Sequence, residues 1–500
     1  MNRTFIVAAV LLVSVSSCSV TNKAYNPDKK YPKEALQQDF TLLRNILESK
    51  HPSLYWYTSK DSMDFYFDKY YKMIEDSMTE LRFGWRVLAP LTDKIHCGHT
   101  SFGMSKAYNK WASDKSFPAF PLFMKVWNDT MVLSGNLNRK DSILKRGMFI
   151  TSINGIKPRE LTNTMFGYMT EDGISNNINY IRLSTNFPYY HRVVYGLRKQ
   201  YDITYKDSTG IEKAIRIPLY EPVNDTTRKN RPRPSMKISK SERKKRRLQD
   251  LRSFAVDTTN NTAVMTVNSF GGSGLRKFFR RSFKTIQQDN INNLVLDLRS
   301  NGGGKINLST LLTKYVTRHP FRIADSATVA ARSLGPYTKY IKGRLLNNLG
   351  LFFLTHKRSD GRRHFTYWEN KTFHAKNKNH FDGDLYVLTN GPTFSASTLL
   401  CNDLKGQPGI TLVGEEAGGG WHGNNGVMIP DITLPNTKLR VRLPLVRLIQ
   451  FNHVPKDGHG VMPDIYVGPD YDALMKGIDK KMEVVEELIK RKRSAVVSNQ

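Results

Sequence analysis

The spacing of apolar residues divides the chain into three regions with different predicted structures. Between residues 34 and 90 apolar side chains recur every three or four positions, as in EALQQDFTLLRNILES and MDFYFDKYYKMIEDSM, and this period predicts helices. From 118 to 222 the apolar runs are short and separated by turn residues, which predicts strands. From 255 onward strand-like runs alternate with helix-like runs. Such an alternation is typical of a layered α/β core.

The elements of the third region follow one another in a regular order. Strands are predicted for NTAVMTVNSF, INNLVLDLRSNGGG, GDLYVLTNGPTF and ITLVGEEAGGG, and helices for LRKFFRRSFKTIQQD, NLSTLLTKYV and SASTLLCNDL. Two of these strands end in runs of glycine. We therefore expect crossover connections and a sheet covered by helices.

The first residues predict export from the cytoplasm. Arg3 precedes an apolar stretch from Phe5 to Val15, which is too short to span a bilayer but suits the core of a signal peptide. The following Ser-Ser-Cys18 completes a segment that resembles the bacterial lipobox, in which the cysteine is lipidated and becomes the first mature residue. A plain signal peptide cleaved nearby is the alternative. We expect a lipid anchor in a bacterial membrane and a place in the cell envelope, facing the periplasm or the cell surface.

The formal net charge of +32 is concentrated in part between 226 and 247, where eleven residues are Lys or Arg and one is Glu. Arg-Pro repeats without apolar periodicity predict a solvated linker. Because no aromatic residues are interleaved and the location is outside the cytoplasm, nucleic acid is not an expected partner. Two alternatives remain for residues 228–247. The segment either contacts anionic lipid or polysaccharide, or it is an inert linker.

Cysteine usage points to no metal or cofactor. Besides Cys18 the chain has Cys97 and Cys401, which are far apart in sequence and give no geometric evidence for a disulfide. No spaced set of Cys and His ligands is present, so we expect no metal site and no cofactor.

The segment GPTFSASTLL, residues 391–400, joins a predicted strand to a predicted helix. Ser395 in this joint could simply cap the helix. Alternatively it is a nucleophile, and the amide of Ala396 at the helix start would then face the charge that forms on the attacked carbonyl. The segment DLRSNGGG, residues 297–304, could supply a second donor, because glycines at a strand end let backbone amides line a pocket.

Three segments in this order, VLDLRSNGGG, YVLTNGPTFSAS and VGEEAGGG, resemble those of the C-terminal processing (tail-specific) serine peptidases and their relative, the tricorn core protease, over about residues 255–468. The resemblance implies a ClpP/crotonase-like catalytic core. It also implies Ser395 as the nucleophile, with the amides of Ala396 and of Gly303 or its neighbour Gly302 as oxyanion donors. Upstream, ILKRGMFITSINGIKPREL looks like the centre of a PDZ domain.

The two branches of this family differ in their general base. Tail-specific peptidases use a lysine downstream of the serine, but Gly420 stands at that place, and we expect the side chain of Lys405 to point elsewhere. The tricorn-like branch takes a histidine from an upstream segment, and TDKIHCGHTSF matches it with His99. His96 is a rival, and Gly98 stands where the family has a hydroxyl residue.

The acid of the tricorn-like branch precedes a Gly-Val-x-Pro-Asp element, and in KDGHGVMPDI the matching residue is Asp457, where the family has Glu. Asp464 in the same segment is interpreted as structural, because Pro-Asp turns are common. His422 and His459 remain possible pocket residues.

The sequence therefore predicts an α/β catalytic domain with a PDZ-like β-rich domain and an N-terminal helical region. The expected order is signal peptide 1–18, tether 19–33, N-terminal helical region 34–117, PDZ-like domain 118–222, basic linker 223–250, serine peptidase catalytic domain 251–470, and C-terminal helix and tail 471–500.

Two functions are compatible with these residues. The first is a serine endopeptidase that cleaves peptides or protein C-terminal regions outside the cytoplasm, through an acyl-enzyme on Ser395 with His99 as general base and Asp457 as its acidic partner. The second is a catalytically inactive lipoprotein that binds a peptide or an envelope component, which the missing lysine favours. A thiol enzyme based on Cys97 is disfavoured because no glycine-framed helix follows this residue.

Overall fold

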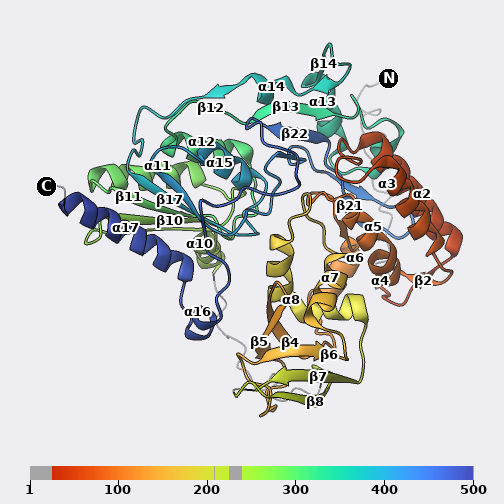
Figure 1. The fold of residues 1–500 in the computed structure, drawn as a ribbon. Coiled ribbons are helices and arrows are strands. Elements are labelled where there is room, and N and C mark those ends of the chain that lie inside the picture. Colours follow the sequence, from red (N-terminus) through yellow and green to blue (C-terminus); the bar gives the residue numbers. More distant parts are fainter. Residues whose placement is uncertain (1–24, 208, 224–238, 499–500) are drawn as a thin grey trace, which may run out of the picture.

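The computed structural model describes residues 25–207, 209–223 and 239–498 (Figure 1). The predictions for Cys18 and for 228–238 lie outside these residues. No helix in the described ranges is long and apolar enough to cross a membrane.

The N-terminal region is helical, as its apolar period predicts. Its helices are α2 (Lys33–Lys50), α3 (Lys60–Lys72), α4 (Glu80–Phe83), a π-helix (Gly84–Leu88), α5 (Ala89–Asp93) and α6 (Lys106–Ala112). Strand β1 (Lys30–Tyr31) pairs with β2 (Met78–Thr79). Helix α2 buries Leu36, Phe40, Leu43 and Leu47, which occupy one face at helical spacing.

The β-rich module is an antiparallel sheet in the order β4-β5-β6-β7-β8. Its strands are Leu122–Trp127, Thr130–Asn136, Phe149–Ile153, Gln200–Lys206 and Glu212–Pro218, and helix α7 (Pro158–Phe166) follows β6 after a short turn. The sequence did not predict α8 (Asn177–Tyr195), which packs on β4. Its pattern is obscured because Pro188 lies inside the helix and the backbone is kinked at Asn186. The PDZ identity of this module stays a prediction.

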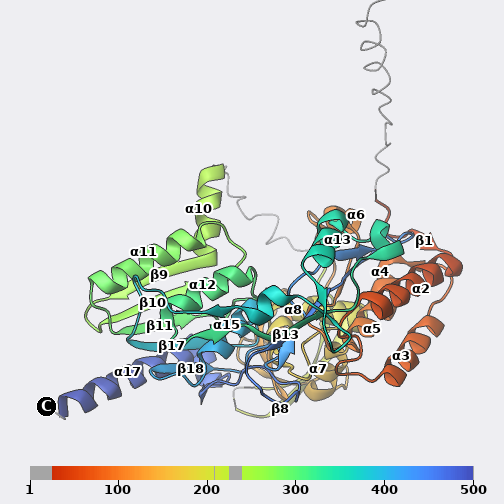
Figure 2. The same cartoon turned by 90° about the horizontal axis from the view of Figure 1, so that it is seen from above.

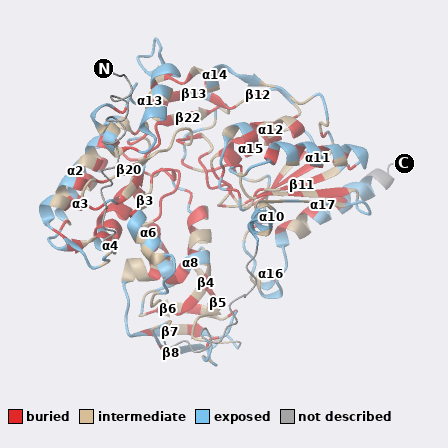
Figure 3. Ribbon diagram, turned by 180° about the vertical axis from the view of Figure 1, so that it is seen from behind, coloured by how far each residue is buried: buried red, intermediate tan, exposed pale blue. Residues whose placement is uncertain are grey.

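The α/β core contains a sheet in the order β23-β18-β17-β11-β10-β9, in which only β9 is antiparallel to its neighbour. In chain order the strands are β9 (Arg252–Asp257), β10 (Thr262–Val267), β11 (Asn293–Asp297), β17 (Asp384–Thr389), β18 (Ile410–Gly414) and β23 (Ile465–Tyr466). Helices α11 (Leu275–Gln288), α12 (Ile306–Val316) and α15 (Ala396–Leu404) cover one face of the sheet, and α17 (Lys480–Ser498) covers the other (Figure 2). Figure 3 shows buried residues along β11 and on α12 and α15. The predicted layered α/β core is confirmed.

A second sheet, in the order β14-β15-β13-β22-β19, lies between the α/β core and the N-terminal helices (Figure 1). Its strands are His356–Lys357, Arg363–His364, Ala324–Val329, Val446–Gln450 and Gly423–Asn424. Nearby, β3 (Phe102–Gly103) pairs with β21 (Arg440–Arg442), which pairs with β20 (Asp431–Thr433). One apolar core contains side chains from both ends of the chain, such as Leu43 and Val441. The segment before β3 is thereby held against the catalytic domain.

The remaining elements are short or peripheral. They are α10 (Lys240–Leu251), β12 (Phe321–Arg322), a 3-10 helix (Gly335–Tyr340), α13 (Arg344–Phe353), α14 (Thr366–Asn370), β16 (Thr372–Phe373) and α16 (Tyr471–Lys476). Helix α10 occupies part of the predicted basic linker. It forms because Lys, Arg and Gln are good helix formers, because Ser239 caps its first turn, and because Arg246 pairs with Glu242, yet it buries none of its residues.

Candidate active site

Ser395 immediately precedes α15 in a backbone conformation that favours glycine, with φ 57° and ψ −119°. Its side chain makes no capping hydrogen bond to the helix. The helix-cap interpretation of Ser395 is therefore wrong. Strained backbone at the start of a helix, with an uncommitted hydroxyl, is the geometry expected of a presented nucleophile.

The loop before Ser395 is held by hydrogen bonds to the glycine-bearing segment after β11. The Thr393 hydroxyl donates to the Leu298 carbonyl over 2.9 Å and accepts from the Asn390 amide over 3.0 Å. The amide of Phe394 donates to the Asn301 carbonyl over 3.0 Å. The two predicted segments are thus joined directly.

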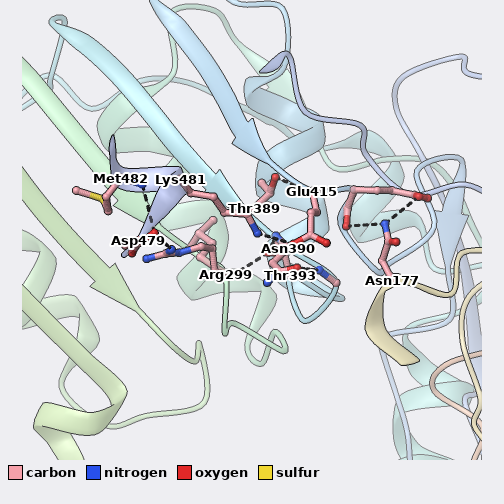
Figure 4. Close-up of polar contacts among 12 residues, drawn as sticks. Asn177, Arg299, Thr389, Asn390, Thr393, Glu415, Asp479, Lys481 and Met482 are labelled. Carbon is pink, nitrogen blue, oxygen red and sulfur yellow. Dashed lines mark hydrogen bonds and ion pairs between the residues drawn. The ribbon is translucent and has the colours of Figure 1, made fainter. Parts of the chain in front are cut away.

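A polar network extends from this loop to other parts of the chain (Figure 4). Lys481 donates to Glu415 over 2.6 Å, and Arg299 to Asp479 over 2.7 Å, so the start of α17 is tied to the strand ends. Asn177 at the start of α8 donates to Glu416 Oε2 over 3.1 Å. These bonds link the β-rich module and the C-terminal helix to the frame that positions Ser395.

Gly303 lies against Ser395. A Cβ added to Gly303 would lie 2.7 Å from Ser395 Cβ and 3.0 Å from the Ala396 nitrogen, and its φ is 93°. The amide of Gly303 donates to Asn301 Oδ1 over 2.9 Å, whereas in the described residues the amide of Gly302 has no hydrogen-bond partner. Gly303 therefore permits the close approach, and Gly302 with Ala396 offers the unengaged donors.

The structure brings His99 to the serine. An ideal Cβ on Gly426 would lie 3.0 Å from Ser395 Oγ and 3.2 Å from His99 Nε2, so the two atoms cannot be farther apart than the sum of these distances. The imidazole is buried against the Phe394 ring, with centroids 4.7 Å apart. Neither ring nitrogen has a hydrogen-bond partner among the described residues. A Cβ on Gly98 would lie 2.7 Å from the Phe394 ring, so a hydroxyl residue would not fit there without a shift.

The carboxylate beside His99 is Asp172, and the structure does not bring Asp457 there. Asp172 Oδ1 lies 4.0 Å from His99 Nδ1 and accepts from the Gly98 amide over 2.7 Å, and Oδ2 accepts from the Gly420 amide over 3.4 Å. Asp457 is exposed, and its Oδ1 accepts from the amide of His459. Sequence reasoning missed Asp172 because it lies in a loop of the β-rich module, in TEDGIS, far from every quoted motif. The one feature of the sequence that could have drawn attention to Asp172 is the pair of acidic residues before Gly173. This pattern is common in exposed turns, so it does not indicate an active-site acid.

Burial controls the protonation of both groups. Burial, together with the charge of Arg442, lowers the pKa of His99 to about 3, because the charged imidazolium is poorly solvated there. Burial raises the pKa of Asp172 to about 7, against the opposing effect of the Gly98 and Gly420 amides. At neutral pH His99 is therefore neutral, as a base requires, and Asp172 is partly ionised.

Cys97 completes a buried cluster with His99 and Asp172, whose potential metal ligand atoms lie within 4.8 Å of one another. Burial raises the pKa of the Cys97 thiol to about 11, so it is protonated at neutral pH and is not a nucleophile. Cys97 and Cys401 are both free thiols.

The rival bases are engaged elsewhere. His96 Nδ1 lies 3.0 Å from Glu171, Lys405 donates to Asp464 over 2.6 Å, and His422 Nδ1 donates to the Val454 carbonyl over 2.8 Å. His459 Nδ1 lies 3.3 Å from Glu416. A Cβ on Gly420 would lie 2.5 Å from the Gly423 carbonyl oxygen, so a lysine would not fit there without a shift.

Asn424 on β19 is a second neighbour that sequence reasoning missed. Its Oδ1 accepts from the Gly426 amide over 3.0 Å and lies 2.9 Å from the same ideal Cβ on Gly426. Its Nδ2 is buried without a partner among the described residues. A buried side-chain donor without a partner is uncommon in folded proteins.

Part of the chain matches a known family, and the fold is similar to that of solved structures. Residues 261–467 match the model of Peptidase family S41. The fold is similar to that of mature CPAF, with a TM-score of 0.59, 13% identity, and coverage of 92% of this chain and 98% of that one. A structure of mature CPAF complexed with lactacystin gives a TM-score of 0.60 at 13% identity, covering 92% and 99%. No curated protein is significantly similar in sequence.

The matched residues contain the glycine run and Ser395, and they span the predicted catalytic domain almost completely. This agreement confirms the resemblance that the three segments suggested. Residues 261–467 form a Peptidase family S41 domain, and the chain is a serine-type peptidase.

Proposed function

We propose that this peptidase hydrolyses internal bonds of peptides or of protein C-terminal regions through an acyl-enzyme on Ser395, with His99 as general base. The observation that carries the proposal is that Ser395 Oγ and His99 Nε2 both lie within 3.2 Å of an ideal Cβ on Gly426, with an imidazole that has no competing partner in the described residues. The two atoms are not hydrogen-bonded to each other in this structure, so they must approach when the substrate binds. We assign the role of the acid to Asp172 in place of Asp457.

The proposed reaction follows from these positions. His99 Nε2 takes the Ser395 proton as Oγ attacks the peptide carbonyl, and the resulting oxyanion accepts from the amides of Ala396 and Gly302. The imidazolium then returns the proton to the leaving amine, and water attacks the acyl-enzyme with His99 again as base. Asp172 stabilises the imidazolium, whose charge is otherwise disfavoured by burial. Its 4.0 Å distance from Nδ1 must shorten on substrate binding for a hydrogen bond to form.

The proposal also includes how the substrate is held and where in the cell the protein is located. The β-rich module is suited to hold a peptide if it is PDZ-like, since such domains add an extended peptide to a sheet edge. Lipidation of Cys18 would anchor the chain in the cell envelope, with anionic lipid near the basic segment 228–247.

A fluorophosphonate probe tests the nucleophile. The wild type should be labelled, Ser395→Ala should not, and the matched control Ser397→Ala, which changes the second serine of the same element, should keep the label. If purified wild type is neither labelled nor able to cleave peptides, the proposed chemistry is wrong and the chain acts by binding alone.

A further inference from the structure

Helix α13 turns its apolar side chains toward solvent. Leu345, Leu346, Leu349, Phe352 and Phe353 are between 44% and 77% exposed, and Figure 3 colours most of the helix as exposed. Their positions are i, i+1, i+4, i+7 and i+8, which form one continuous stripe on a helix. Soluble proteins rarely leave such a contiguous apolar patch uncovered.

The opposite side of α13 is fastened to the protein. Asn348 Oδ1 accepts from the Leu334 amide over 2.8 Å, and Leu351 is buried in the core shared with the N-terminal region. Gly350 lies close to Met428, where an added Cβ would be 3.1 Å from the methionine methyl. Asn348, Gly350 and Leu351 thus face inward, and this attachment holds the apolar stripe toward solvent.

The segments that flank the stripe are basic. Between residues 330 and 365 there is one acid, Asp360, which lies 2.9 Å from His364 Nε2. The same range contains eight cations: Arg332, Lys339, Lys342, Arg344, Lys357, Arg358, Arg362 and Arg363. The Arg332 guanidinium lies 3.6 Å from the centre of the Phe352 ring, which places a cation on the stripe itself.

Other basic elements lie on the same side of the molecule. In Figure 2, α10, α13 and β1 lie along one side. Helix α10 carries Lys240, Arg243, Lys244, Lys245, Arg246 and Arg247 and buries no residue. An apolar stripe among cations is the pattern of a helix that lies in a membrane interface.

We propose that α13 docks this chain onto an anionic lipid bilayer. The apolar stripe enters the boundary between headgroups and acyl chains, and the flanking lysines and arginines contact lipid phosphates. A second copy of the chain is the less suitable occupant, because a two-fold contact would bring two sets of eight cations together. The proposal depends on neither the chemistry of Ser395 nor the lipidation of Cys18.

Vesicle flotation tests the docking without the lipid anchor. The full chain with Cys18→Ala should bind vesicles of phosphatidylcholine and phosphatidylglycerol, and binding should weaken in pure phosphatidylcholine and at high salt. Adding Leu346→Gln and Phe353→Gln should lower partitioning into anionic vesicles at least about tenfold. The matched control is Phe65→Gln with Ile211→Gln, since these side chains are 62% and 59% exposed elsewhere.

A probe on the helix reports insertion directly. Phe353→Cys carrying an environment-sensitive fluorophore should shift its emission to shorter wavelength on anionic vesicles, because the side chain enters an apolar layer. A wild type that stays in solution, or a Leu346/Phe353 variant that binds equally well, would overturn the proposal. So would a dimer in solution that the same two substitutions abolish, because α13 would then cover a second copy.

Discussion

Replacing Asp172 by Asn tests the assignment of the acid most directly. The Asp172 carboxylate lies 4.0 Å from His99 Nδ1, and at an effective dielectric constant near 20 a full charge pair at this separation is worth about 4 kcal/mol. This charge acts on the imidazolium that forms in the transition state. Its loss should therefore lower kcat by about a thousandfold. The assay is the cleavage rate of a fluorogenic peptide at pH 8, where Asp172 is mostly ionised.

The matched variant is Asp457→Asn. Asp457 is exposed and accepts one backbone hydrogen bond, which an amide oxygen can also accept, so activity should stay within about threefold of the wild type. Asp172→Asn should not unfold the protein. Because the folded-state pKa of Asp172 is raised to about 7, its contribution to stability is lost as pH rises through 7, and Asp172→Asn should remove this pH dependence of Tm. The substitution also removes one of the two backbone hydrogen bonds that the carboxylate accepts, because an asparagine side chain has one acceptor oxygen. If Asp457→Asn costs more activity than Asp172→Asn, our reasoning on the acid is refuted.

Four further outcomes are expected. Activity of the wild type should rise with pH through about 7 as Asp172 ionises, and Asp172→Asn should lose this rise; an unchanged inflection would assign it to another group. His99→Ala and Ser395→Ala should each reduce kcat by orders of magnitude and combine non-additively, since they act as one unit, whereas additive losses in the double variant would contradict the pair. Gly303→Ala should abolish activity because its Cβ would meet Ser395, while Gly406→Ala, which has a similar positive φ but open space around it, serves as the control. Cys18→Ala should abolish metabolic labelling of the protein with a fatty acid, and unchanged labelling would argue against lipidation.

Several structural features could be predicted because they depend on neighbouring residues. The strand–helix joint at Ser395 and the glycine run at 302–304 are contiguous motifs whose conformations follow from local chemistry. The sequence also shows that Gly420 occupies the position of the lysine base in tail-specific peptidases, so the absence of that base could be predicted. By contrast, the sequence does not predict α8, because an internal proline obscures its period. It predicts a linker where α10 forms, because this helix buries no residue, although its residues favour a helix.

The acid and the outward face of α13 were decided only by the tertiary structure. Asp172 reaches His99 because a loop of the β-rich module packs on Gly98 and Gly420, and no local pattern encodes a contact between segments so far apart in the chain. The apolar spacing of α13 is present in the sequence, but spacing alone does not say whether that face is covered. The hydrogen bonds of Asn348 and the packing of Leu351 turn that face outward. Sequence by itself determined the local conformations and the chemical groups available. Which groups meet, and which face solvent, depends on packing between distant segments, because burial and charge act through space.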